Sequence, residues 1–156
     1  MPTNRRILLE SRPKAAATTS NFRLEEVAVP TLQPGQFLVR NHWLSLDPYM
    51  RGRMNESRSY AQPQALGEVM QGGTAGEVIE SRNPGFAVGS KVVAYLGWQE
   101  YGVSDGTGVF KVDTRHRRIN ATLKAMRGVS MHAQFTRAAN DGTWCEMGCF
   151  QKYFRG

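Results

Sequence analysis

The chain has 156 residues, of which 40% are apolar, so it is long enough to form one domain with a hydrophobic core. Sixteen glycines, seven prolines and 10% aromatic residues favour a turn-rich, strand-rich globule. No apolar run approaches the roughly 18 residues of a transmembrane helix. Two cysteines are too few for a disulfide framework, and residues 1–13 lack the apolar core of a secretory signal. We therefore expect a soluble, cytoplasmic protein that does not associate with membranes.

The positive charge of the chain is concentrated near its end. The formal net charge is +7, but residues 1–113 carry 12 Lys and Arg against 11 Asp and Glu, a net of +1. Residues 114–156 carry 8 against 2, a net of +6. This distribution favours a solvated, basic extension, with a phosphate-binding arm as the less favoured interpretation. Nucleic acid is therefore not an expected partner.

The first 113 residues contain short apolar or alternating segments separated by turn residues. Pro34-Gly35, Asp47-Pro48 and Asn83-Pro84-Gly85 are strong turn signals. Short strands with turns every ten or so residues are typical of a small barrel, so we predict a mainly β, partly open barrel with short helices. The predicted strands cover residues 6–10, 22–29, 36–46, 68–71, 76–81, 91–96, 100–103 and 109–112.

The densest chemical signal is the segment 41–53, NHWLSLDPYMRGR. It reads as the end of a strand, a turn, and one helical turn that begins at Pro48. Such a turn exposes a phenol and guanidinium groups beside residues 52–66, which are polar, lack a clean period and are predicted to form a mobile loop. On chemistry alone, Tyr49 and Met50 could equally well cap the barrel.

The composition and the pattern of strands and turns change after Asp113. We place a boundary there between residues 1–113 and a divergent basic tail, residues 114–156. Asn120 is a candidate helix cap, and apolar residues recur at three-residue spacing over residues 120–135, although Gly128 weakens a helix there. We expect the tail to be at most partly helical.

Several chemistries find little support in the residues. Cys145 and Cys149 could be counted with His132 and His116 as a zinc set, but the spacing lacks a second ligand pair, so we expect no metal. The run Gly72–Gly76 and the segment that begins at Gly106 do not have the spacing of a dinucleotide-binding loop. They are better explained as bulges and tight bends in a small barrel.

A family resemblance is carried by four stretches in a fixed order. WLSLDPYMRGRM at 43–54 and VMQGGTAGEVIESRNPGFAVGSKVVAYLGWQEY at 69–101 are flanked by RRILLESRP at 5–13 and FKVD at 110–113. These resemble the N-terminal, GroES-like domain of medium-chain reductases of the zinc-free leukotriene B4 dehydrogenase, prostaglandin reductase and curcumin reductase group. The resemblance implies NADPH-dependent reduction of the double bond of small, apolar α,β-unsaturated carbonyl compounds or quinones.

The resemblance also implies roles for individual residues. Tyr49 is the candidate catalytic residue, because a hydroxyl beside the carbonyl oxygen stabilises the enolate that forms when hydride reaches the β-carbon. Asp47 and Asn41 are expected to fix the turn by hydrogen bonds. The candidate substrate contacts are Met50, Arg51, Tyr60 and Trp98.

The chain departs from the family after Asp113. The family continues with a Rossmann domain that carries a glycine-rich nucleotide loop, and neither is present in this sequence. We therefore expect a truncated or frameshifted product that binds no NADPH by itself and is inactive alone. The alternative is a non-catalytic module that, without a cofactor domain to cover its cleft, self-associates as a homo-oligomer or binds a partner chain.

Overall fold

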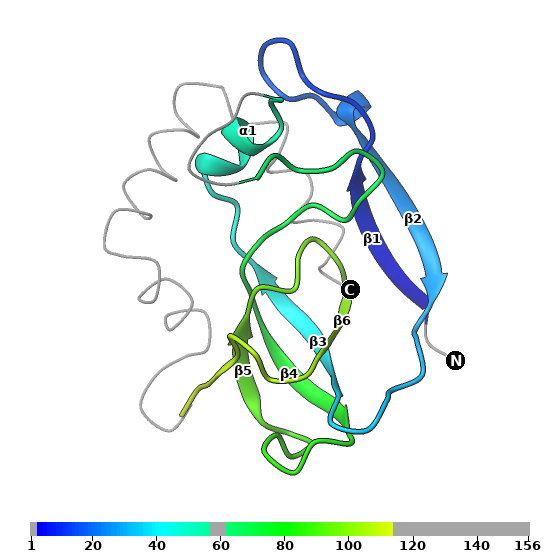
Figure 1. Ribbon diagram of the computed structural model, residues 1–156, viewed down its shortest axis with the longest axis vertical. Helices are drawn as coiled ribbons and strands as arrows, with labels where there is room; N and C mark the ends of the chain where they lie inside the picture. Colours follow the sequence, from blue (N-terminus) through cyan, green and yellow to red (C-terminus); the bar gives the residue numbers. More distant parts are fainter. Residues whose placement is uncertain (1–2, 57–61, 114–156) are drawn as a thin grey trace.

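The computed structural model of the protein describes residues 3–56 and 62–113. These residues form seven strands, one short α-helix and one 3-10 turn (Figure 1). The strands lie in a two-stranded sheet, β1-β2, and a five-stranded sheet in the order β6-β3-β4-β5-β7, and neither sheet closes on itself. This confirms the predicted mainly β, partly open architecture. The elements are β1 (Thr3–Leu9), η1 (Thr19–Asn21), β2 (Phe22–Ala28), β3 (Phe37–Leu44), α1 (Tyr49–Arg53), β4 (Thr74–Ser81), β5 (Lys91–Ala94), β6 (Tyr101–Ser104) and β7 (Phe110–Lys111).

The first two strands form a separate ribbon beside the larger sheet (Figure 1). They pair antiparallel, with Ile7 opposite Leu24. Ile7 is buried and Leu24 is half exposed, so β1 supplies the core side of the ribbon while β2 faces solvent. Charged residues along β2 make it a poor template for pairing with another chain, because an edge strand that carries charges is protected against aggregation.

The five-stranded sheet is antiparallel throughout and is built around β3 and β4. Its buried side chains Phe37, Val39, Val78 and Val92 form one core cluster. Phe86 closes this cluster by stacking on Phe37 with ring centroids 4.3 Å apart. Burial alternates only in part of β3, where Val39 and Asn41 are buried and Arg40 and His42 are exposed. The first three residues of β3 and of β4 are buried consecutively, because these ends of the strands are covered on both faces.

Irregular backbone joins the two sheets. The Trp98 carbonyl accepts a hydrogen bond from Ile7 N at 2.9 Å, and Met70 N donates to the Ile7 carbonyl at 2.9 Å. The prediction of a strand at residues 68–71 is wrong, because only an isolated bridge forms there, between Val69 and Leu8. The backbone of this segment forms hydrogen bonds with two different neighbours: Met70 bonds to Ile7 of β1 through its amide and to Trp98 through its carbonyl. A regular ladder with one neighbouring strand therefore does not form.

A second core cluster lies between the ribbon and α1. Its buried members come from β1, from the segment around α1 and from the irregular joining segments. They are Ile7, Leu9, Ala17, Leu46, Met50, Met54, Met70 and Trp98. This cluster fixes the position of α1, which lies at the end of the molecule opposite the β4–β5 turn (Figure 1).

Three expectations fall on residues that the structure does not describe. They are the basic tail at 114–156 with its candidate helix at 120–135, the central part of the predicted loop, 57–61, and the cysteine and histidine set of the tail.

Candidate functional site

The turn before α1 is built from buried polar groups. Ser45 and Asp47 are 5% and 2% exposed, and Ser45 Oγ donates to Asp47 Oδ1 at 3.0 Å. Met50 N donates to the Asp47 carbonyl at 3.0 Å, which starts the helix after Pro48. A helical turn beginning at Pro48 was predicted, and the structure confirms it. The expectation that Asp47 fixes this turn agrees with these bonds.

Tyr49 is the first residue of α1 and lies half-buried against the second core cluster. Its Oη atom is 2.6 Å from Oη of Tyr95, which follows directly after β5. The Arg53 guanidinium lies over the Tyr49 ring, 5.7 Å from the centroid. Arg53 thus packs on the ring face of Tyr49 in a cation–π contact, while the Tyr49 hydroxyl pairs with Tyr95.

Arg51 is held by backbone oxygens. Its Nη2 donates to the Pro13 carbonyl at 3.0 Å and its Nε to the Ala15 carbonyl at 2.9 Å, while Nη1 donates to Asn55 Oδ1 at 2.6 Å. The guanidinium therefore ties α1 to the 13–15 loop. These bonds give Arg51 a structural role, and its contact with substrate stays a prediction.

Two other candidate contacts lie in the core. Met50 and Trp98 are 1% and 0% exposed, and Trp98 stacks on Phe22 with ring centroids 5.5 Å apart. Both were expected to touch substrate, but side chains buried to this degree present no surface to a ligand. Their apolar character is used for packing, and a sequence pattern cannot separate a buried tryptophan from one that lines a cleft.

The two remaining candidates are Asn41 and Tyr60. Asn41 lies within β3, and its Nδ2 donates to the Gln99 carbonyl at 2.9 Å. This bond joins β3 to the segment before β6, away from the turn at Asp47. Tyr60 lies outside the described residues.

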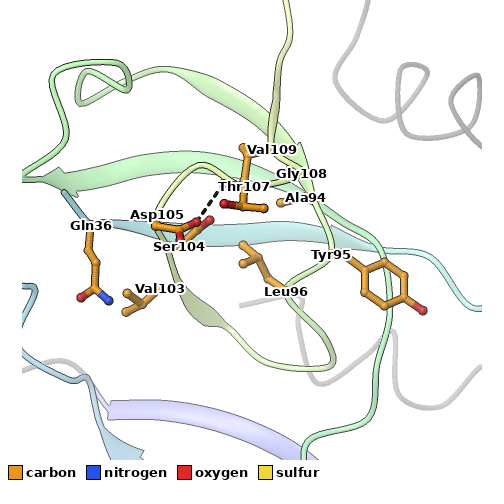
Figure 2. A pocket seen from close by; sticks show the side chains of 10 residues that line it. All are labelled: Gln36, Ala94, Tyr95, Leu96, Val103, Ser104, Asp105, Thr107, Gly108 and Val109. Atoms are coloured by element: carbon orange, nitrogen blue, oxygen red, sulfur yellow. Dashed lines mark hydrogen bonds between the residues drawn. The ribbon is translucent and has the colours of Figure 1, made fainter. Parts of the chain in front are cut away.

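Tyr95 is the residue near Tyr49 that the sequence analysis did not select. It is 49% exposed and also lines a cavity of about 390 Å³ (Figure 2). The cavity lies between the end of β5 and the β6–β7 turn, where Asp105 Oδ1 accepts a bond from Thr107 N at 2.8 Å. These hydrogen bonds from Thr107 hold the pKa of Asp105 below its ordinary value. No local signal marks Tyr95, because its pairing with Tyr49 spans 46 residues.

A row of charges crosses the outer face of the larger sheet. Lys91 and His42 both approach Glu77, with His42 Nε2 3.8 Å from Glu77 Oε2, and Arg40 lies opposite Glu77 in the strand register. Burial, reinforced by the Arg40 and Lys91 charges, lowers the pKa of His42 despite the attraction of Glu77. The hydrogen bond from Lys91 lowers the pKa of Glu77. His42 is therefore mainly neutral near pH 7 and makes no strong ion pair there.

The glycine runs do not fit a nucleotide. A Cβ atom on Gly72 would lie 3.0 Å from the Trp98 indole, and one on Gly97, whose φ is +79°, would lie 2.8 Å from the Met70 carbonyl oxygen. Within the predicted glycine segments, a Cβ atom on Gly106, whose φ is +102°, would likewise lie 2.7 Å from the Phe86 ring. Gly72 and Gly106 are therefore required by close approach within the fold, in agreement with the prediction of bends and bulges, and Gly97 is a further such position that was not predicted. In residues 3–56 and 62–113 we find no glycine-rich cradle for the phosphates of NADPH, so no reaction step is assigned through that cofactor.

Residues 3–56 and 62–113 offer neither a metal-binding cluster nor a membrane-spanning helix. This part of the chain contains no group of three His, Cys, Asp or Glu side chains arranged to hold a metal ion. It also contains no helix with the length and apolarity needed to span a membrane.

The family match and the similar proteins of known sequence point to the same group of oxidoreductases. Residues 5–112 match a family described as the N-terminal domain of oxidoreductase. The chain is 50% identical over 109 residues to the NADPH-dependent curcumin reductase of Escherichia coli, covering 70% of this chain and 32% of that protein. It is 38% identical over 95 residues to prostaglandin reductase 1 of Rattus norvegicus, covering 61% of this chain and 27% of that protein. The chain thus spans about a third of these relatives.

A solved structure agrees with the sequence relatives. CurA from Vibrio vulnificus, in complex with NADPH, superimposes with a TM-score of 0.71 at 44% identity, covering 76% of this chain and 35% of that one. The recognition of the zinc-free medium-chain reductase group from the sequence motifs is confirmed by these matches.

Proposed function

Since this chain belongs to the family that forms the N-terminal domain of oxidoreductases, we propose that it provides the substrate-side part of an NADP-dependent oxidoreductase. The proposed reaction is reduction of the double bond of an α,β-unsaturated carbonyl compound or a quinone. The 50% identity with an NADPH-dependent curcumin reductase over 109 residues is the observation that carries the proposal.

The arrangement around α1 supports a role at the carbonyl end of the substrate. Addition of hydride to the β-carbon of an enone moves an electron pair onto the carbonyl oxygen, and a proton then completes the saturated product. A hydroxyl donor placed at that oxygen stabilises the developing charge. Tyr49 provides such a donor on a helix whose next residue, Met50, is locked in the core.

No contact with the cofactor is assigned to the described residues, 3–56 and 62–113. NADPH supplies the hydride in the proposed reaction, and the described glycines are used for packing. We therefore expect the 156-residue chain to give no turnover when it is mixed with NADPH and a simple enone.

The proposal is tested in a hybrid enzyme. Residues 5–112 of this chain replace the matching part of the Escherichia coli curcumin reductase, and NADPH oxidation is followed with 2-cyclohexenone and with 1,4-benzoquinone. We expect turnover with at least one of them, and we expect Tyr49→Phe to lower kcat/KM about a hundredfold, the usual effect of removing one donor to a developing oxyanion. A folded hybrid that oxidises NADPH with neither compound, or that tolerates Tyr49→Phe, contradicts the proposal.

A second candidate function is a self-associating or partner-binding module. It is favoured by large apolar side chains that are exposed on the larger sheet, namely Trp43 at 40% and Phe110 at 56%. Large apolar side chains left in water on the surface of a sheet favour association. Sedimentation of the purified chain tests the self-associating form of this candidate, which predicts a homo-oligomer, and a stable monomer across a dilution series contradicts that form.

A further inference from the structure

The cavity beside the β6–β7 turn is lined partly by hydrogen-bonding groups and partly by apolar side chains (Figure 2). It measures about 390 Å³ and lies between the end of β5 and that turn. Small-molecule sites in proteins have volumes of roughly 300–1,000 Å³, so this cavity is large enough for a ligand with a single ring. Tyr49 is not among the residues that line it. The contacts proposed for the substrate carbonyl therefore do not account for this cavity.

The polar part of the lining comes from a turn that is held by its own hydrogen bonds. Asp105 Oδ1 accepts from Thr107 N at 2.8 Å, and Ser104 Oγ accepts from Gly106 N at 3.1 Å. From the β4–β5 turn, Asn83 Nδ2 donates to the Asp105 carbonyl at 2.9 Å. The Asp105 carboxylate is therefore held at the cavity in advance. Binding of a ligand does not need to order this turn, which favours affinity.

The lining carries one negative charge and no positive charge. Among the described residues that line the cavity, Asp105 is the only one with a charged side chain. Within residues 3–56 and 62–113, no Lys, Arg or His side chain forms an ion pair with it. Backbone and side-chain hydrogen bonds from Thr107 lower the pKa of Asp105, so its carboxyl group is ionised at neutral pH. The cavity therefore attracts a cation.

Apolar side chains form the rest of the lining. Leu96, Val103 and Val109 line the cavity, and Leu96 and Val109 also pack against the core cluster of the larger sheet. Leu96 lies so close to β6 that a Cβ atom on Gly102 would be 2.8 Å from Leu96 Cβ. These apolar side chains are therefore fixed by the core, and they offer a preformed surface for the apolar part of a ligand.

We propose that this cavity binds a small organic amine, whose ammonium group pairs with the Asp105 carboxylate and whose apolar ring or chain packs against Leu96 and Val109. An ammonium group has several protons to donate, and the hydroxyl oxygens of Ser104 and Thr107 line the same cavity as further acceptors. The proposal goes beyond the proposed function. Because the ligand is neither the substrate nor the cofactor of that reaction, failure of either proposal leaves the other standing.

The first arm of the test compares a cation with a neutral molecule of the same shape. The full chain, labelled with ¹⁵N, is titrated at neutral pH with 2-phenylethylamine and, separately, with 2-phenylethanol, and the backbone amide shifts are followed. We expect 2-phenylethylamine to give saturable shifts at residues 103–109, with an affinity about tenfold higher than that of the alcohol. A hydrogen bond to a charged group commonly gives an advantage of this size. Shifts that do not saturate there, or equal affinities for the two probes, overturn the proposal.

The second arm uses variants of the full chain. Asp105→Asn removes the charge and keeps an Oδ1 acceptor for Thr107 N, so we expect it to weaken 2-phenylethylamine binding about tenfold and to leave 2-phenylethanol binding unchanged. The matched control, Glu26→Gln, removes the same charge from an exposed position on β2 and should not change either affinity. Equal affinities of the Asp105 and Glu26 variants for the amine overturn the proposal.

A third variant keeps the test decisive if Asp105→Asn disturbs the turn. Val103→Phe fills part of the cavity from β6 and leaves Asp105 in place. We expect it to weaken the binding of both probes, because the apolar part of each probe loses its space. If the folded Val103 variant binds 2-phenylethylamine as tightly as the unchanged chain does, the cavity is not the binding site and the proposal is overturned.

Discussion

Gly76 of β4 passes so close to Arg40 of β3 that a Cβ atom at position 76 would overlap the Arg40 carbonyl oxygen. The same atom would lie 2.9 Å from Val39 Cγ1, inside the core. The obstacle is backbone and a buried side chain, so neither moves aside without disturbing the β3–β4 ladder. The ladder is irregular at this point, with a register shift between Asn41 and Trp43.

We therefore predict that Gly76→Ala destabilises the protein by about 1–3 kcal/mol or more, because overpacking forces shifts in a closely packed interior. The change is measured as the free energy of unfolding from urea titration. Gly52→Ala is the matched control, since a Cβ atom at Gly52 in α1 meets nothing within 4 Å. Alanine also favours a helix over glycine by roughly 1 kcal/mol, so the control should be neutral or stabilising. Equal losses in both variants would contradict the explanation by close approach.

Asn4 provides a second prediction. It is 3% exposed, and its amide links β1 to residues 99–101: Nδ2 donates to Gln99 Oε1 and to the Tyr101 carbonyl, both at 3.0 Å, and Oδ1 accepts from Tyr101 N at 3.0 Å. Asn4→Leu leaves the Tyr101 amide without this buried acceptor. We expect a loss of about 1–3 kcal/mol in the free energy of unfolding, the usual cost of one unsatisfied buried group.

The free energy of unfolding of Asn4→Leu is compared with that of a control variant at Leu24, on the other strand of the same ribbon. Leu24 opposite Ile7 is half exposed, so Leu24→Asn removes only partly buried apolar surface and should lower the unfolding free energy by no more than about 1 kcal/mol. A loss at position 4 no larger than at position 24 would show that the amide does not hold β1 to the 99–101 segment.

The strands could be predicted because their cause is local. Residues 37–39 and 91–94 combine β-branched or aromatic residues with flanking turn signals, and both form strands within a residue or two of the predicted bounds. The segment 68–71 has the same local character but divides its hydrogen bonds between two neighbours. Whether the segment pairs with one strand or with two neighbours depends on tertiary structure, and a local sequence pattern carries no information about it.

The candidate site could be predicted only in part, for the same reason. Tyr49 was selected from its motif, and the turn before it follows from Asp47 and Pro48. The burial of Met50 and Trp98, and the pairing of Tyr49 with Tyr95, depend on which distant segments meet. Residues separated by 46 positions carry no mutual signal in one sequence.

Arg51 gives a prediction about local stability. Its guanidinium donates to the carbonyls of Pro13 and Ala15, so it holds the 13–15 loop against α1. We expect Arg51→Met to lower the backbone NMR order parameters of residues 14–17 while leaving those of β3 and β4 unchanged, because loops move more freely when their few bonds are removed. Lys14→Met, on the same loop and exposed, is the control and should not change these order parameters. Unchanged order parameters in the Arg51 variant would contradict the anchoring role.

His42 gives the pH prediction. Burial, Arg40 and Lys91 lower its pKa below the ordinary 6.5, while Glu77 opposes them, so the folded protein favours the neutral imidazole. As the pH falls through 6.5, the unfolded chain takes up a proton before the folded chain does, and the free energy of unfolding decreases. The stabilisation that neutral His42 gives the folded state is therefore complete above pH 6.5. It is lost as the pH falls toward the lowered pKa of His42 in the folded protein.

His42→Gln removes this titration and keeps a polar side chain on β3. We expect the urea midpoint of the unchanged protein to fall more than that of the variant between about pH 7.5 and pH 5.5, above the range in which most carboxylates titrate. Because Lys91 still pairs with Glu77 in the variant, the difference in slope reports His42 alone. A variant whose stability falls as steeply as that of the unchanged protein would show that His42 is not desolvated on the sheet, and a steeper fall would show that Glu77 raises its pKa instead.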